Sequence, residues 1–219
     1  SADAGYSAAQ YLLGQRYFYG NGVPADKNRS LSYLRAASVD DYRAVVLLKI
    51  IAQGSRGEKK DLESVATLVK RKAVSKDSNA QLTFAFMHLI GDGVPKDARE
   101  EVRWYRAAAV KNARAAFMLS LMYQSGEGVS RNPAEAFRLM RSAADKGAPR
   151  AQYYLGTFYY QGVGTQINQQ SAAVWFRRSA VSGYADAQLA YGMLLLSGDG
   201  VPVDKAQAVE WLSKAARQN

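Results

Sequence analysis

The sequence contains no cysteine and a single histidine, His88, and both shortages narrow the chemistry open to it. Without cysteine there is no disulfide, no thiolate zinc site and no cysteine nucleophile, and the redox compartment is left open. The lone histidine has no carboxylates at the spacing of a metal site or a catalytic triad. We therefore expect no metal, no cofactor and no catalytic activity.

Long apolar runs are also missing. No stretch approaches the 18 or so apolar residues of a membrane helix, and the first residues contain no signal-peptide core. The 219 residues are 48% hydrophobic and 22% charged, which is ordinary for a globular protein with a substantial core. The sequence predicts a soluble chain without a transmembrane segment.

Paired glycines are the most conspicuous motif that is present. The stretch "GNGVPAD" at 20–26 resembles the start of a phosphate-binding loop, but variants of it return at 91–97, 126–132, 162–168 and 198–204. A nucleotide fingerprint occurs once per domain and needs a third glycine or a Gly-Lys-Ser/Thr ending, which these stretches lack. The motif therefore predicts a repeated turn of the chain, not a ligand site.

A repeat of 35 or 36 residues fills the chain. Six alanines open successive copies: Ala9, Ala44, Ala80, Ala115, Ala151 and Ala187. A period of this size is typical of stacked helical hairpins, in which each unit buries its apolar face only against its neighbours. We expect one solenoid domain over 1–219.

The fifth copy illustrates the expected unit. Residues 151–161 have the spacing of a helix, here called helix A. Gly162 and Gly164 allow the unusual backbone angles of a chain reversal, and Asn168 stands where it can cap a second helix, helix B. Each copy thus predicts a helix-turn-helix hairpin.

The repeated pattern, Ala-x(3)-Leu-Gly-x(2)-Tyr-x(2)-Gly-x-Gly-Val-Pro-x-Asp followed by an aromatic residue and a pair of alanines, resembles the Sel-one-like repeat, a relative of the tetratricopeptide repeat. The third copy departs only slightly, with Ala85 at the Gly position and His88 at the Tyr position. The second copy is degenerate, because Lys49 takes the Gly position and no Gly-x-Gly-Val-Pro turn follows. There we expect a longer turn between the helices.

This resemblance implies an all-α fold, a right-handed superhelical solenoid of about six helix-turn-helix repeats. Residues 1–8 match the sequence around 179–186, so we expect them to be the tail of a preceding repeat, in a mature piece of a longer precursor.

A column of small residues runs through the middle of helix A. Gly14, Gly156 and Gly192 occupy it, with Ala85 and Ser120 in the same place. Since glycine within a helix costs about 1 kcal/mol relative to alanine, a packing reason is needed. We predict that helix B of the same copy crosses closely at this column.

The formal net charge is +10, from 29 Lys and Arg against 19 Asp and Glu. Part of this charge recurs near the end of helix B, directly before the position of the alanine pair in the repeat pattern. These residues are Arg35, Arg71, Arg106, Arg178 and Lys214, and we expect them to form a solvated stripe. The basic residues lack the interleaved aromatics that stack on bases, so we expect no nucleic-acid partner. An acidic protein partner or an anionic surface fits the charge better.

If the A helices line the inner face of the superhelix, residues three, seven and ten of each point into a groove. These candidate partner-binding residues are Tyr11, Gln15, Phe18, Leu82, Phe86, Leu89, Phe117, Leu121, Gln124, Tyr153, Thr157, Tyr160, Leu189, Met193 and Leu196. Apolar and aromatic residues of this kind are typical of a protein interface. The alternative, that neighbouring helices bury them as core, stays open.

The resemblance implies a non-catalytic module that binds another protein, in a bacterial periplasm or at the envelope. We favour an immunity protein that inhibits a secreted toxic effector, such as a phospholipase. A scaffold for envelope assembly, polysaccharide export or host interaction is the alternative, and a nucleic-acid-binding factor is a more remote one.

Overall fold

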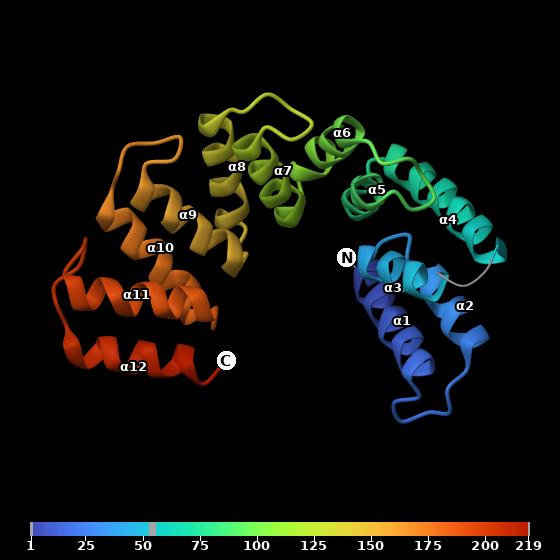
Figure 1. The fold of residues 1–219 in the computed structure, drawn as a ribbon, viewed down its shortest axis with the longest axis horizontal. Coiled ribbons are helices and arrows are strands. Elements are labelled where there is room, and N and C mark those ends of the chain that lie inside the picture. The colour runs from blue at the N-terminus through green and yellow to red at the C-terminus, as the bar shows by residue number, and fades with distance from the viewer. Residues whose placement is uncertain (1, 53–55, 219) are drawn as a thin grey trace. The chain divides into compact units, whose positions relative to one another are not determined.

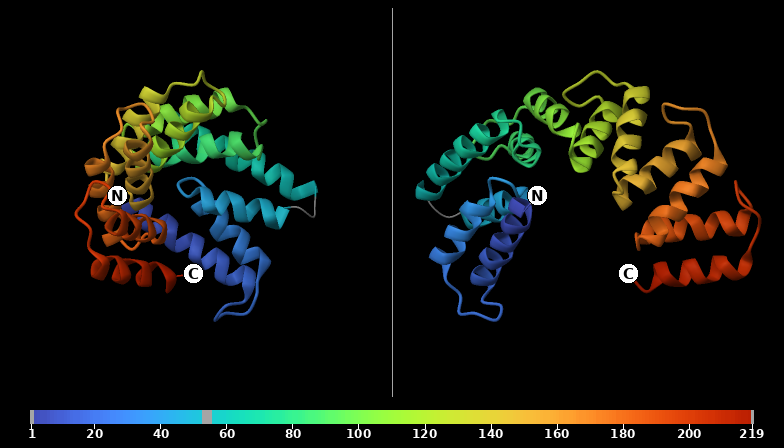
Figure 2. Two further views of the ribbon diagram at one scale, coloured as in Figure 1. Left: turned by 60° about the vertical axis from the view of Figure 1, so that its left-hand side comes forward. Right: turned by 180° about the vertical axis from the view of Figure 1, so that it is seen from behind.

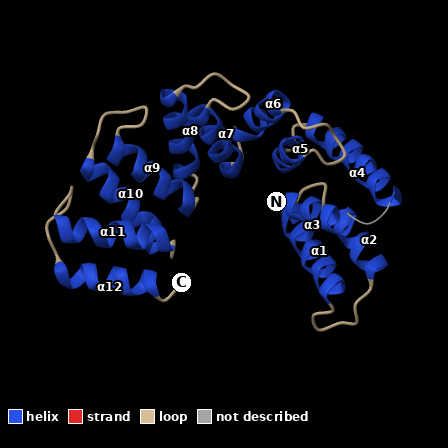
Figure 3. Ribbon diagram, in the orientation of Figure 1, coloured by secondary structure: helices blue, strands red, loops and turns tan. Residues whose placement is uncertain are grey.

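The computed structural model describes the backbone of residues 2–52 and 56–218, with side chains at 6–51 and 62–218. This part of the chain forms twelve α-helices and no strand (Figures 1 and 3). The helices are α1 (Ala2–Tyr19), α2 (Lys27–Ala37), α3 (Tyr42–Ala52), α4 (Arg56–Val74), α5 (Ser78–Ile90), α6 (Ala98–Ala109), α7 (Ala113–Ser125), α8 (Pro133–Asp145), α9 (Pro149–Gln161), α10 (Gln169–Val181), α11 (Ala185–Ser197) and α12 (Lys205–Ala216). The predicted all-α class and its helical hairpins are confirmed.

The chain divides into two compact units, residues 1–112 with α1 to α6 and residues 113–219 with α7 to α12. In both units an odd-numbered helix packs against the even-numbered helix that follows it, and α3 with α4 is the weakest such pair. In both views of Figure 2 the two helices of the α9–α10 and α11–α12 hairpins remain side by side. Within each unit, even-numbered helices also pack on the next odd-numbered one, as α10 does on α11.

The glycine pair produces the turn that the sequence predicts. Gly162 ends α9 with a φ of 73°, and Gly164 follows with a φ of 67°, both in the left-handed region. The backbone N–H of Asn168 then donates to the carbonyl of Tyr159 at 2.9 Å, while its side chain accepts from the N–H of Ser171 at 2.8 Å. The same backbone bond closes the other four turns, from Asp26 to Tyr17, Asp97 to His88, Asn132 to Tyr123 and Asp204 to Leu195.

The second glycine of the turn has a further packing role. A Cβ on Gly164 would overlap the carbonyl group of Pro133, at the start of α8. In the same way, a Cβ on Gly200 would overlap the carbonyl group of Gln169, and one on Gly93 that of Leu62. Each of these turns therefore lies directly on helix B of the preceding copy, and only glycine leaves room for that contact.

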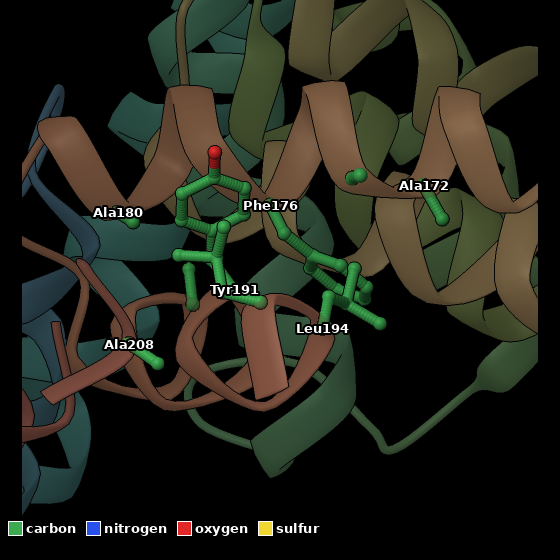
Figure 4. Packing of buried hydrophobic residues seen from close by; sticks show 9 residues of the cluster. Ala172, Phe176, Ala180, Tyr191, Leu194 and Ala208 are labelled. Carbon is green, nitrogen blue, oxygen red and sulfur yellow. The ribbon is translucent and has the colours of Figure 1, made fainter. Parts of the chain in front are cut away.

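The cluster around Phe176 shows how neighbouring copies share a core. Side chains of α10 and α11 meet there, and alanines on both helices keep the backbones close (Figure 4). Its buried members are Ala172, Ala173, Phe176, Ala180, Ala187, Tyr191, Leu194, Leu195 and Ala208. This core is continuous across a repeat boundary, as expected where no hairpin can bury its apolar face alone.

The small column of helix A lies where the two helices of a hairpin cross, as predicted. A Cβ on Gly192 would come within 2.9 Å of Leu212 in α12. In the fourth copy the serine of this column, Ser120, donates its hydroxyl to the carbonyl of Ala136 at 2.6 Å. In the first copy the serine is on helix B instead of helix A, and Ser30 of α2 donates to the carbonyl of Gly14 in α1 at 2.8 Å. Small side chains thus allow the crossing, and one hydroxyl can join the two backbones.

We predict that Gly156→Ala lowers the free energy of unfolding by about 2 kcal/mol, because it inserts a methyl group into a packed core. This loss should occur although alanine is the better helix former. The new Cβ would lie 2.8 Å from two ring carbons of Phe176, which is buried and cannot move aside. Urea denaturation measures the change. In the Phe176→Leu background the same substitution should be much milder, and a stabilising Gly156→Ala in the wild-type background would show that the crossing is loose.

The degenerate second copy keeps both helices, but the expectation of a longer turn is wrong. Helix α3 ends at Ala52 and α4 already begins at Arg56, whereas seven residues separate α1 from α2. Residues 53–55 of the connection lie outside the described part. No proline or Gly-x-Gly pair follows Arg56, so nothing stops α4 from starting early and reaching 19 residues.

Lys49, in the small column of this copy, has a different partner. Its Nζ forms an ion pair with Asp92 at 3.0 Å and donates to the carbonyl of Ile90 at 3.2 Å, both in the next copy. Helix α4 packs chiefly on α5 and much less on α3. A long charged side chain is incompatible with a close crossing, so the second copy is held by its neighbour more than by its own hairpin.

At the start of the chain, the predicted tail of a preceding repeat is continuous with the first helix A. Residues 2–8 do not form a separate helical tail followed by a corner, because α1 runs without a break from Ala2 to Tyr19. Alanines at positions 2, 4, 8 and 9 favour helix strongly enough to include Gly5. Ser1 lies outside the described residues.

Candidate partner-binding surfaces

Helix α11 presents three exposed apolar side chains of the predicted set. Leu189 is 51% exposed, Met193 54% and Leu196 40%. Their spacing of four and three residues places them on one face of the helix. The opposite face of α11 belongs to the buried cluster around Phe176. These three residues, called the α11 stripe below, are accessible.

Tyr160 of α9 lies beside the end of α11. Its exposed ring reaches the loop that follows α11, where the phenol donates to Oδ2 of Asp199 at 3.4 Å. Thr157, one turn earlier, is half-buried and donates its hydroxyl to the carbonyl of Tyr153 at 3.2 Å. Tyr160 thus extends the accessible surface, while the hydroxyl of Thr157 is used within its own helix.

Tyr153 belongs to an aromatic group. Its ring lies 5.4 to 5.6 Å from the rings of Tyr154, Phe176 and Tyr184. Burial, with a smaller contribution from Asp186, raises the pKa of both Tyr153 and Tyr184. Both phenols are therefore harder to ionise than an exposed tyrosine.

In α7 the predicted residues are less accessible. Phe117 is only 6% exposed, and its ring packs edge-on against Tyr154 at 5.2 Å, with the guanidinium of Arg150 5.2 Å above it. Leu121 and Gln124 are half-buried. Phe117 is thus a core residue that borders the surface, because the start of α9 covers it.

In the first unit the three predicted residues of α1, which are Tyr11, Gln15 and Phe18, are half-buried. The ring of Tyr11 lies 4.6 Å below the guanidinium of Arg43, and Gln15 donates to the phenol of Tyr11 at 3.5 Å. Phe18 contacts Tyr19 edge-on at 4.8 Å. Their polar and aromatic groups are partly engaged within the unit.

In α5, Leu82 is 8% exposed, whereas Phe86 and Leu89 are half-buried. The ring of Phe86 packs on Tyr42 of α3 at 5.0 Å. Because α3 packs against α5, Leu82 is core, not partner surface. That the remaining predicted residues share one groove stays a prediction.

The sequence prediction missed a cavity of about 320 Å³ in the second unit. Arg114, Phe117 and Met118 of α7 line it together with Pro149 and Arg150 at the start of α9. A signal was present, since both arginines directly precede the alanine that opens a copy. The prediction covered only the third, seventh and tenth residues of helix A, with that alanine counted as the first.

A second cavity, of about 640 Å³, lies in the first unit between α4 and the α5–α6 hairpin. Two acidic residues line it, Glu63 and Glu100. Glu100 already accepts from Arg103 at 3.0 Å and from the Trp104 indole at 3.1 Å. The Nδ1 atom of His88, at the Tyr position of the repeat, lies 3.1 Å from the carbonyl oxygen of Pro95. His88 therefore has a partner within its own turn. Among the described residues, no three His, Asp or Glu side chains are grouped to hold a metal ion.

The family comparison agrees with the repeat. A family model described as the Sel1 repeat matches residues 7–38, 80–109, 113–147, 149–184 and 185–219. The unmatched stretch contains the degenerate second copy. The predicted resemblance is therefore confirmed. A comparison with curated proteins found no match.

Solved structures give the same fold. A Sel1 repeat protein from Oxalobacter formigenes is 34% identical with a TM-score of 0.74, over 99% of this chain and 64% of its own. A protective antigen of uropathogenic Escherichia coli strains, which displays an SLR fold, is 30% identical with a TM-score of 0.72, over 99% of this chain and 47% of its own. The chain thus spans about half to two thirds of the length of these two proteins.

A more distant likeness is to an immunity protein from Pseudomonas aeruginosa, with 16% identity and a TM-score of 0.53, over 97% of this chain and 81% of its own. At this identity the likeness concerns the fold alone. No helix in the described part of the chain combines the length and apolarity needed to cross a membrane.

Proposed function

The chain belongs to the Sel1 repeat family of protein-interaction modules, and we propose that it holds a partner protein against the exposed faces of its odd-numbered helices. The observation that carries this proposal is the α11 stripe. Single exposed apolar side chains are common on any protein. Three on one helical face, with Tyr160 beside them, form the kind of contiguous apolar surface that marks an interface.

We propose more specifically that the partner is a secreted toxic effector, of phospholipase type, which the chain inhibits as an immunity protein in the periplasm or at the envelope. The shared fold with the immunity protein from Pseudomonas aeruginosa supports the choice of this hypothesis. The net charge of +10 favours an acidic binding partner. A scaffold for envelope assembly, polysaccharide export or host interaction is the competing role.

Affinity capture from the native cell extract, followed by titration calorimetry with the purified partner, tests both levels. A single stoichiometric secreted effector whose activity falls on binding would support the immunity role. Several envelope-assembly proteins would favour the scaffold and remove the immunity role. A strongly salt-dependent affinity for nucleic acid, with no protein bound, would contradict the proposal altogether.

Truncating the α11 stripe should weaken partner binding. We expect Leu189→Ala, Met193→Ala and Leu196→Ala combined to lower the affinity for the captured partner by at least tenfold, because each removes apolar contact area from the interface. Helicity and the melting temperature should change little, since all three side chains are exposed.

The matched control truncates Val174 of α10 and Val209 of α12, which are equally exposed but lie on helices of the B type. This double variant should bind the partner normally. Equal losses in the two variants, or no loss in either, would show that the stripe is not the interface.

A further inference from the structure

The cavity between α7 and α9 combines apolar walls with two basic residues. Phe117, Met118 and Pro149 supply apolar surface, and Arg114 and Arg150 supply the charge. None of the described residues that line it is acidic. Its volume of about 320 Å³ is at the lower end of the ligand pockets of proteins, which suits one or two side chains of a partner better than a large cofactor.

Arg150 is held in a position that leaves its hydrogen-bond donors available. Its guanidinium lies over the rings of Phe117 and Tyr154, at 5.2 and 5.8 Å. A guanidinium beside aromatic rings can still bind a carboxylate through two parallel N–H groups. Among the described residues, no carboxylate forms an ion pair with Arg150. The two rings contact the guanidinium of Arg150, and its N–H groups can bind a carboxylate of another protein.

The charge of the surrounding unit favours the same kind of occupant. Residues 113–219 contain eleven Lys and Arg and seven Asp and Glu, a net charge of +4. Both arginines line one small cavity, so an anion bound there would be attracted by two positive charges. The apolar walls beside the two arginines favour a ligand that has an apolar group next to its anion.

We propose that this cavity receives an acidic segment of the protein partner, with an Asp or Glu carboxylate between Arg114 and Arg150 and a neighbouring apolar side chain against Phe117 and Met118. The inference rests on the proposed function and adds the chemistry of the partner. It places this contact in the second unit, at residues outside the predicted set except for Phe117.

The test uses fluorescent twelve-residue peptides and the full chain. One peptide alternates Glu and Asp around two central leucines, a second has Gln and Asn in place of the acids, and a third has alanine in place of leucine. Fluorescence anisotropy should show binding of the first peptide, no measurable binding of the second and weaker binding of the third. The affinity of the first should fall at least tenfold in Arg150→Gln and in Arg114→Gln, as expected for a lost charge-assisted hydrogen bond.

Arg177→Gln in α10 is the matched control, because it removes the same charge from an exposed position of the same unit. It should weaken binding less than threefold, and Arg150→Lys should retain part of the affinity. Melting temperatures confirm that each variant is folded. Equal losses in Arg177→Gln and Arg150→Gln, or no binding of the first peptide, would overturn the proposal.

Two further probes identify the anion. Binding of phosphatidylglycerol vesicles or of inorganic phosphate through the same two arginines, without binding of the acidic peptide, would assign the site to a phosphate group and overturn the acidic segment. With the captured partner, loss of binding in the α11 variant but not in Arg150→Gln would refute this inference alone. Unchanged binding in both variants would refute the proposed function.

Discussion

Gly164→Ala is expected to lower the free energy of unfolding by roughly 3 kcal/mol, the largest effect of any glycine substitution proposed for this chain. Two causes add together. A side chain at a φ of +67° is strained, and the new Cβ would overlap the backbone of Pro133 and Ala134 at the start of α8. The overlapping atoms are backbone and cannot rotate away, so the turn would have to separate from the preceding copy. Urea or thermal unfolding measures the loss.

Gly183→Ala separates the two causes. Gly183 has a φ of +86°, but nothing lies within 4 Å of the place that a Cβ would take, so only the backbone strain remains. We expect a loss of about 1 kcal/mol. If both substitutions cost the same, the contact between turn and preceding helix does not contribute to stability.

Phe158→Ala should lower the free energy of unfolding by about 4 kcal/mol, as for other large buried aromatic side chains. Phe158 of α9 is among the largest fully buried side chains. Its truncation leaves a cavity that the hairpin cannot close without moving its neighbours. Chemical denaturation gives the magnitude, and hydrogen exchange should show the loss first in α8 to α10, because repeat proteins transmit contacts mainly to adjacent repeats.

Tyr160→Ala, two positions along the same helix, is the matched control. Tyr160 is exposed, so we expect a change in the free energy of unfolding within about 1 kcal/mol. By contrast, the same variant should bind the captured partner less tightly, because the phenyl ring belongs to the proposed contact surface. A destabilisation as large as that of Phe158→Ala would place Tyr160 in the core and remove it from that surface.

The sequence determined the elements of this protein and their order, because these depend on short-range chemistry that recurs every 35 or 36 residues. Paired glycines with positive φ, an Asp or Asn cap and helix-length apolar spacing act within a few residues of each other, so reading them one copy at a time is sufficient. The small column of helix A was predictable for a related reason. A glycine that costs helix stability, repeated at one position, requires a close neighbour, and Phe176 and Leu212 are such neighbours.

Only the tertiary structure decided which individual residues of different helices touch, since that depends on residues far apart in the chain. The contact of Gly164 with Pro133, the ion pair of Lys49 with Asp92, and the burial of Leu82 and Phe117 all cross from one helix or copy to another. A periodic pattern predicts on which face of its own helix a side chain lies. Its exposure to solvent, however, depends on whether side chains of a neighbouring helix cover that face. The placement of Arg150 over the ring of Phe117 has the same origin: two residues 33 positions apart meet because α9 begins where α7 presents its aromatic face.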